Sequence, residues 1–196
     1  MKKLLLLLCA ILLIFGLVGS AGATVLTFDD VMDPMPATNA RLPNGYGGLN
    51  WNNFWVINSK WDQSGGIGYT TGVKSPDYVA ANYKGEVSSA GGGVFNFLGA
   101  YLTSAHDAPN SAVITGYLGP DLVYQTDPLI LTVVATEHDF GTAFYGIDRL
   151  TFSSTSQFVM DNVTYNPVPE PATMLLLGFG LIGMTVIGRK RFFRKA

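Results

Sequence analysis

The apolar positions of this 196-residue chain follow two kinds of pattern. Continuous apolar runs occupy Leu4–Val18 and Ala172–Gly188, close to the two ends. Between them no long segment keeps the 3.6-residue period of an amphipathic helix, and short stretches rich in β-branched and aromatic residues recur instead. The chain therefore divides into an N-terminal segment (residues 1–23), a central body (24–167) and a C-terminal segment (168–196).

The central body is predicted to be all-β. Phe95, Phe97 and Tyr101 alternate with other residues along one stretch, and clusters of Gly, Pro, Asn and Asp separate the stretches, as turns require. This spacing is typical of a two-sheet sandwich, and we expect one of the jelly-roll type. The expected strands are Val25–Phe28, Gly48–Trp51, Phe54–Ile57, Val94–Leu102, Ala112–Tyr117, Leu129–Val134, Tyr145–Phe152 and Phe158–Tyr165.

One stretch, Asn58–Gly93, lacks this spacing and is predicted to be a long, polar, Gly-rich loop of the kind that is usually functional. Aromatic rings on such a loop offer apolar faces for sugars to stack on, while neighbours such as Asp62 and Asn82 bind the hydroxyls. The alternative is that the same rings fold inward and complete the core. The candidate carbohydrate-binding residues are Trp61, Tyr69, Tyr78 and Tyr83.

The N-terminal segment has the three parts of a secretory signal peptide. Lys2 and Lys3 precede the apolar run, and the small-residue pattern Ala21-Gly22-Ala23 follows it. We expect signal peptidase to cut after Ala23; the alternative is an uncleaved membrane anchor, for which the apolar run is short. The only cysteine, Cys9, lies in this segment, so we expect a mature protein without disulfides or thiol chemistry.

The C-terminal segment joins a proline-rich stem to an apolar run and a basic tail. Pro169, Glu170 and Pro171 form a stem that cannot continue a helix. Residues 172–188 are predicted to form a single transmembrane helix about 25 Å long, near the lower limit for crossing a bilayer. The basic tail, residues 189–195, is expected to stay in the cytoplasm, which leaves the body outside that membrane.

This order of parts resembles the PEP-CTERM sorting signal of Gram-negative, exopolysaccharide-producing bacteria. The resemblance implies that an exosortase recognises Pro169, Glu170 and Pro171, cleaves nearby, and moves the protein from the inner membrane to the cell surface or the medium. The body is also similar, in residues 27–30, 46–51, 146–152 and 160–163, to domains that precede such signals and look like jelly-roll carbohydrate-binding modules. The alternative is a permanent tail anchor in which Pro-Glu-Pro occurs by chance.

The charge of the body and the motifs that it lacks argue against several classes of function. It carries five basic and 13 acidic residues, a net charge of −8, which disfavours nucleic acid as a partner. It has no zinc pattern, phosphate-binding glycine loop or Gly-x-Ser-x-Gly elbow. His106-Asp107 and Glu137-His138-Asp139 are candidate acid–base groups, but each lies beside residues typical of turns, where solvated polar clusters are expected.

We therefore predict a secreted envelope or matrix protein without enzyme activity, with a binding or structural role and exopolysaccharide as its expected partner. A secreted polysaccharide hydrolase is the alternative, because the spacing of carboxylates in the fold is not visible in the sequence.

Asp29, Asp30 and Asp161 are candidate ligands of a structural calcium ion, and no other cofactor is expected. The first and last strands of a jelly roll commonly lie near each other, which would bring these carboxylates together. The alternative is that Asp29 and Asp30 begin a turn and that Asp161 pairs with Arg149.

Overall fold

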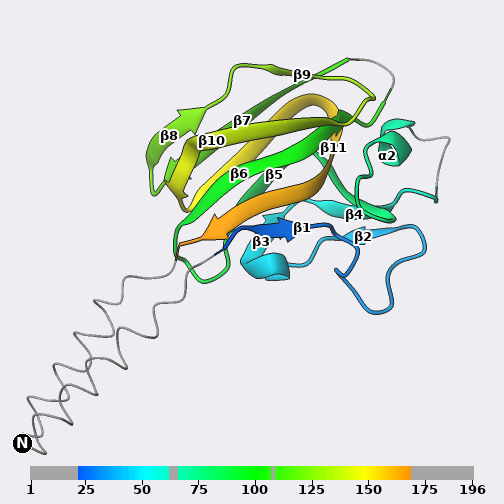
Figure 1. Cartoon of the computed structure of the whole chain (residues 1–196), viewed down its shortest axis with the longest axis horizontal. Coiled ribbons are helices and arrows are strands. Elements are labelled where there is room, and N and C mark those ends of the chain that lie inside the picture. Colours follow the sequence, from blue (N-terminus) through cyan, green and yellow to red (C-terminus); the bar gives the residue numbers. More distant parts are fainter. Residues whose placement is uncertain (1–21, 62–65, 107–108, 169–196) are drawn as a thin grey trace, which may run out of the picture. The chain divides into compact units, whose positions relative to one another are not determined.

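The alternating stretches form antiparallel strands that hydrogen-bond into one continuous, bent sheet (Figure 1). The computed structural model describes residues 22–61, 66–106 and 109–168. A short 3₁₀ turn, η1 (Tyr46–Gly48), and a one-turn helix, α2 (Gly68–Thr71), interrupt the strands. Within the described ranges the strands are β1 (Thr24–Leu26), β2 (Asn39–Arg41), β3 (Leu49–Asn52), β4 (Trp55–Asn58), β5 (Tyr78–Ser89), β6 (Phe95–Ser104), β7 (Asn110–Leu118), β8 (Asp121–Gln125), β9 (Leu129–Leu131), β10 (Thr136–Ile147) and β11 (Arg149–Pro167).

The long strands β5 and β11 run side by side and contribute to both layers of a sandwich. Residues 149–154 of β11 pair with β7, whereas residues 158–167 pair with β6, and a register shift between Ser153 and Phe158 marks the change. One layer has the order β10-β6-β11-β5-β4-β2, and the other extends from the same β5 and β11 to β3, β7, β8 and β9. The body is therefore all-β and of the jelly-roll type, as predicted.

The first and last strands lie side by side, as predicted for a jelly roll. β1 pairs antiparallel with the end of β11, and Thr24 lies opposite Tyr165. Beyond that strand, the backbone N–H of Val168 donates a 3.1 Å hydrogen bond to the carbonyl oxygen of Val94. The two ends of the described body therefore emerge from one pair of strands, at the same end of that pair (Figure 1).

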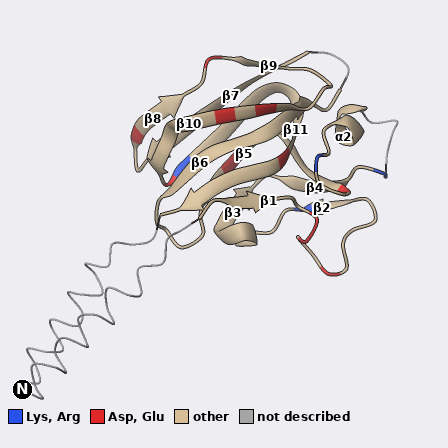
Figure 2. Ribbon diagram, in the orientation of Figure 1, with Lys and Arg blue, Asp and Glu red and all other residues tan. Residues whose placement is uncertain are grey.

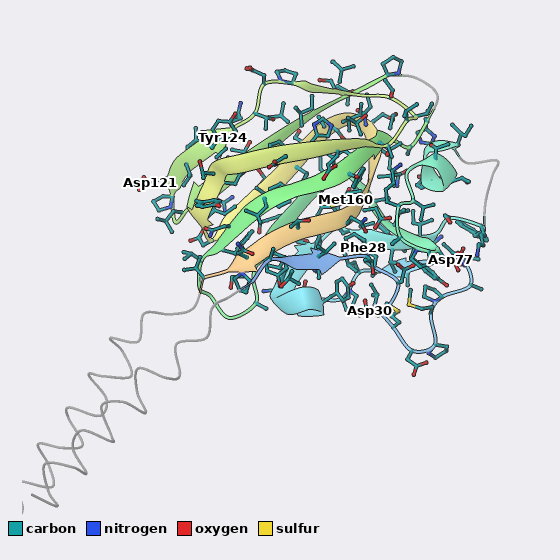
Figure 3. All side chains as sticks on the ribbon, viewed as in Figure 1. Phe28, Asp30, Asp77, Asp121, Tyr124 and Met160 are labelled. Carbon is teal, nitrogen blue, oxygen red and sulfur yellow. The ribbon has the colours of Figure 1, made fainter. Side chains whose placement is uncertain are left out.

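The core between the layers is built mainly from aromatic rings. A series of ring contacts links Phe28, Trp51, Phe54 and Phe152, with centroids 5.4–5.7 Å apart and near-perpendicular planes. Edge-to-face pairs of this kind contribute about 0.5–1.5 kcal/mol each beyond the burial of their apolar area. Phe28 and Met160, both labelled in Figure 3, are fully buried in this core.

The prediction of a loop throughout Asn58–Gly93 is wrong, because this stretch contains α2 and the whole of β5. β5 has a glycine in its middle, and β3, β4 and β11 pair with it along its length. A Cβ atom at Gly85 would lie only 2.4 Å from the ring of Phe54, so the position that weakens the strand pattern is required by the core. The local sequence pattern therefore does not predict β5, because close packing requires a glycine within this strand.

The expected strand boundaries near the C-terminal end are also partly wrong. The predicted strand Tyr145–Phe152 spans the end of β10 and the start of β11, and Gly146, with φ of 67°, lies just before the break. The predicted strand Phe158–Tyr165 is the second half of β11. β8 was not predicted because all five of its residues are exposed, so it shows no alternation of apolar and polar positions.

Acidic positions outnumber basic ones on the ribbon of the body (Figure 2). Among the described residues no helix is both long enough and apolar enough to cross a bilayer. Ala23, at the expected cleavage position, is exposed. The predictions on Ala21, on Pro169, Glu170 and Pro171, on the apolar residues 172–188 and on the basic tail 189–195 fall outside the described residues.

Candidate functional site

A groove of about 370 Å³ opens beside β4, where α2, the start of β2, the segment just after β6 and the middle of β11 come together. We call it the aromatic groove, because three of its lining residues are Trp or Tyr. No Asp, Glu, Lys or Arg is among the described residues that line it. The lining residues are Asn39, Trp55, Ile57, Trp61, Tyr69, His106 and Gln157.

Strand β4 supplies one wall of the aromatic groove through its two-residue period. Phe54 and Val56 are fully buried in the main core, and Trp55 and Ile57 point to the opposite face. Asn39 of β2 lies directly opposite Ile57 in the strand register, which adds an amide to this wall. The same pleat that fills the core therefore presents an indole at the surface.

Helix α2 supplies the second wall. Gly68 lets α2 pack closely on the end of β6, because a Cβ atom there would overlap the backbone of Ser104. The next residue, Tyr69, donates a 2.6 Å hydrogen bond from its hydroxyl to Oε1 of Gln157 on β11. Its ring also meets the edge of His106, with centroids 6.4 Å apart. These contacts fix the orientation of the Tyr69 ring.

Trp61 is the most exposed aromatic residue of the aromatic groove, with 47% of its surface accessible. Its backbone N–H donates a 3.0 Å hydrogen bond to the carbonyl oxygen of Asn58, which ties it to the end of β4. Near the rim, the guanidinium of Arg41 lies 5.0 Å from the centroid of a Trp55 ring. The half-buried indole of Trp55 thus lies close to a positive charge on an otherwise acidic body.

Two of the four predicted carbohydrate-binding residues, Trp61 and Tyr69, line this groove. Tyr78 does not, because its hydroxyl donates to the carbonyl oxygen of Pro36 at 3.0 Å and accepts from Asn58 at 3.3 Å. Its ring packs against the main core, which is the inward alternative stated above.

The remaining predicted residues of that stretch do not contribute to the aromatic groove. Tyr83 belongs to β5, and its side chain is not among the described parts of the chain. Asn82 is 4% exposed and donates to the carbonyl oxygen of Asn53, so it serves the fold. Asp62 lies outside the described residues.

Five lining residues of the groove were not predicted from the sequence: Asn39, Trp55, Ile57, His106 and Gln157. A signal existed for Trp55, because a tryptophan between Phe54 and Val56 must face away from the core side of a strand. No comparable signal existed for Asn39, His106 and Gln157, which reach the groove through pairing of distant segments.

The two sets of candidate acid–base residues lie in different parts of the sequence and of the fold. His106 lines the aromatic groove, and Asp107 is outside the described residues. Glu137, His138 and Asp139 lie inside β10, so the expectation that they flank a turn is wrong.

Asp161 fastens a loop to the sheet. This fully buried carboxylate accepts hydrogen bonds at 2.6 and 2.8 Å from the backbone N–H groups of Lys74 and Ser75. It also accepts from the Ser75 hydroxyl and from the N–H of Asn162. Burial raises the pKa of Asp161, and these donated hydrogen bonds oppose that rise. Arg149 pairs with Glu86 at 3.6 Å, so the alternative of an Asp161–Arg149 pair is wrong.

Asp29 and Asp30 begin a turn after β1. Oδ1 of Asp29 accepts from the N–H groups of Asp77 and Tyr78 at 3.0 and 3.1 Å, and Asp30 accepts from the Tyr46 hydroxyl at 2.8 Å. Burial and the bond to Asp30 raise the pKa of Tyr46. The described residues contain no group of three or more His, Cys, Asp or Glu suited to a metal ion. The calcium site stays a prediction.

Comparison with known proteins identifies the C-terminal segment. Residues 167–191 match the PEP-CTERM protein-sorting motif, which confirms the resemblance drawn from the sequence. The motif implies an exported protein that an exosortase sorts to the cell surface. No curated protein matches the chain.

Two solved structures show a distant similarity. The CBM22-1–GH10 modules of the endo-1,4-β-D-xylanase 10B of Clostridium thermocellum, complexed with xylohexaose, share 10% identity with this chain at a TM-score of 0.39. That match covers 77% of this chain and 29% of the xylanase chain, so this chain spans under a third of its length. TmCBM61 in complex with β-1,4-galactotriose shares 10% identity at a TM-score of 0.33, over 64% of this chain and 89% of that one.

Proposed function

We propose that this exosortase-sorted protein binds an extracellular polysaccharide through the aromatic groove and has no catalytic activity of its own. The proposal rests on one observation above all. Trp61 and Tyr69, a Trp and a Tyr from a Gly-rich stretch, come together with Trp55 beside the amides of Asn39 and Gln157. Flat apolar rings with amides between them are suited to a ligand that has both C–H faces and hydroxyls.

The rigidity of the aromatic groove supports binding. The Tyr69 ring is held by its hydrogen bond to Gln157, and Trp55 is held within β4 by the pairing of β4 with β2 and β5. Side chains that are ordered before the ligand arrives lose less conformational entropy when it binds. Arg41, beside Trp55, supplies a positive charge that favours polysaccharides with acidic groups despite the net charge of the body.

The composition of the aromatic groove supports a non-catalytic role. Glycoside hydrolysis normally needs a pair of carboxyl groups on either side of the scissile bond. The described residues that line the groove include neither Asp nor Glu, and the amides of Asn39 and Gln157 do not titrate. Among the described lining residues, a sugar held there meets two amides and the imidazole of His106, and no carboxyl group.

Titration of the full chain, purified in detergent, with the exopolysaccharide of the producing cells tests the proposal. Trp61→Ala is expected to weaken binding about three- to tenfold, the equivalent of roughly 0.7–1.4 kcal/mol of lost stacking. Ile67→Ala is the matched control, because Ile67 is 49% exposed, lies at the start of α2 and is not among the residues that line the groove. Equal affinity for Trp61→Ala and the parent protein would remove the aromatic groove from the function.

Two further measurements separate this function from its alternatives. Release of reducing sugar by the purified chain, lost on substitution of a carboxylate, would establish the hydrolase alternative instead.

Comparison of cells with and without the exosortase tests the sorting step. We expect a tagged chain to be retained at full length in the inner membrane when the exosortase is absent, and identical size and location in both strains would contradict this.

A further inference from the structure

A second hollow, of about 390 Å³, lies on the outer face of the layer that contains β6. Its lining comes from four strands that lie next to one another in the order β1, β11, β6 and β10. Val163 and Tyr165 of β11 are buried in the core, so Asn162 and Thr164, which line this outer hollow, alternate to the other side. The outer hollow shares no lining residue with the aromatic groove.

The outer hollow exists because three neighbouring strands are irregular at the same level. In β11 the pairing shifts register between Asp161 and Thr164, and Asn162 has a positive φ of 49°. In β10 the register shifts just after Asp139. Between them β6 has Gly99, whose missing side chain lets the backbone of β10 come close. Bulges are frequent beside binding sites, where they bend a strand and redirect its side chains.

The lining combines an apolar surface with polar groups. Val25, which is 52% exposed, and Leu98 offer C–H surface, and the ring of Tyr101 lies beside them. The Tyr101 hydroxyl donates a 3.0 Å hydrogen bond to Oε2 of Glu137, which orients that carboxylate on the rim. Asp139 is the second carboxylate of the lining. Apolar surface with a few oriented polar groups is the usual composition of a small-ligand site.

The polar groups are mainly hydrogen-bond acceptors and carry negative charge. Glu137 and Asp139 are acidic, and none of the described lining residues is Lys or Arg. His138 adds no positive charge at neutral pH, because burial lowers its pKa. Lys74 brings one positive charge near the lining, because its Nζ lies 5.4 Å from the centroid of the Tyr101 ring, and the two carboxylates remain in excess over this single cation. A suitable ligand therefore donates hydrogen bonds and carries no negative charge.

From this we infer a second glycan-binding site: the outer hollow binds uncharged, hydroxyl-rich sugar units and excludes uronic acids. Hydroxyl groups donate to Glu137 and Asp139, and the C–H face of the sugar rests on Val25 and Leu98. A chain with this site and the aromatic groove binds two polysaccharide segments at once. Two linked sites raise the avidity for a polymer far above the affinity of either site.

The test uses the full chain, labelled with ¹⁵N in detergent, titrated with the neutral probes xylohexaose, cellohexaose and mannohexaose and with the acidic probe hexagalacturonate. At least one neutral probe is expected to shift the backbone amide signals of Gly99, Ala100 and Thr164. Hexagalacturonate is expected to leave these signals unchanged. Failure of all three neutral probes to move them, or stronger binding of the acidic probe, overturns the proposal.

Variants test whether the shifts of the amide signals come from binding in the outer hollow. Glu137→Ala is expected to weaken binding there about tenfold, the equivalent of about 1.4 kcal/mol. Asp121→Ala is the matched control, because Asp121 is an exposed acid on β8 that does not line the hollow (Figure 3). If both variants lose affinity equally, net charge alone explains binding and the site is rejected. Tyr101→Phe provides a second test: it keeps Glu137 but frees it from Tyr101, and a loss of two- to threefold or more is expected.

The two proposals fail separately in this design. With Trp61→Ala, shifts at Tyr69 and Ile57 disappear if the aromatic groove binds sugar, whereas shifts at Gly99 and Thr164 remain if the outer hollow is independent. Loss of both sets of shifts in Trp61→Ala overturns the second site.

Discussion

Phe54 and Trp55 are neighbours in the sequence and have opposite roles. Phe54 is completely buried, with the rings of Trp51 and Phe152 at 5.4 and 5.7 Å, and it belongs to the main core. Trp55 is half-buried, lies against the second, smaller core cluster and faces the aromatic groove with Arg41 beside it. Residue type therefore does not tell which aromatic residues of this protein fill the core and which line the groove. The face of the strand on which each ring lies decides it.

The largest loss of stability is expected from removing a ring of the main core. Phe54→Ala is expected to lower the free energy of unfolding by about 3–5 kcal/mol, because a cavity is left among rings that have no room to collapse. Trp55→Ala is expected to lower it by no more than about 1–2 kcal/mol, since only part of that ring is buried, and to weaken polysaccharide binding. Urea unfolding followed by circular dichroism measures both. Equal destabilisation by the two variants would contradict the division of β4 into two faces.

A smaller loss of stability is expected from removing Asp161, the buried carboxylate that holds the loop before β5 by hydrogen bonds. Asp161→Ala removes the acceptor of the N–H groups of Lys74, Ser75 and Asn162. We expect it to lower the free energy of unfolding by about 3 kcal/mol, because each of the three donors left unpaired costs at least about 1 kcal/mol. Asp30→Ala is the control, because Asp30 is exposed and accepts only from Tyr46 among the described hydrogen bonds. Thermal unfolding of the two variants under one buffer gives the comparison.

Calcium would distinguish a metal-binding role of these carboxylates from a purely hydrogen-bonding one. A calcium ion held by Asp29, Asp30 or Asp161 would stabilise the folded state by about 2.7 kcal/mol at a free concentration one hundred times the dissociation constant. The measurement is the melting temperature of the full chain in calcium and in chelator. A rise that disappears in Asp29→Asn would establish the site, and identical melting temperatures would reject it.

The smallest effect on stability is expected from a change of pH. Burial lowers the pKa of His138 below its value of 6.5 in the unfolded chain, so the unfolded state takes up a proton first as the solution is acidified. The stability that neutral His138 contributes is fully present above pH 6.5 and is lost as the pH falls through the folded-state pKa. Between pH 7.5 and 5, the melting temperature of the parent protein should therefore fall further than that of His138→Gln. Parallel curves would show that His138 does not titrate differently on folding.

Several features of the fold were predictable from the sequence. The alternation of Phe95 and Phe97 with other residues, the turn clusters between strands and the absence of a helical period were enough to predict an all-β sandwich with adjacent first and last strands. These are local features, because the pleat of a strand places each residue on one face whatever its neighbours in space are. The sorting motif was equally readable, since a contiguous segment carries it.

Long-range pairing decided the rest. β5 is a strand because β3, β4 and β11 pair with it, although Gly85 weakens its local pattern. The aromatic groove forms because α2 packs on the end of β6 and brings Tyr69 to Gln157, 88 positions further along the chain. Local sequence patterns are therefore enough to predict the class of fold, the sorting signal and which aromatic side chains are present. Which of those rings meet at the surface depends on long-range pairing, because no local period records contacts between segments so far apart.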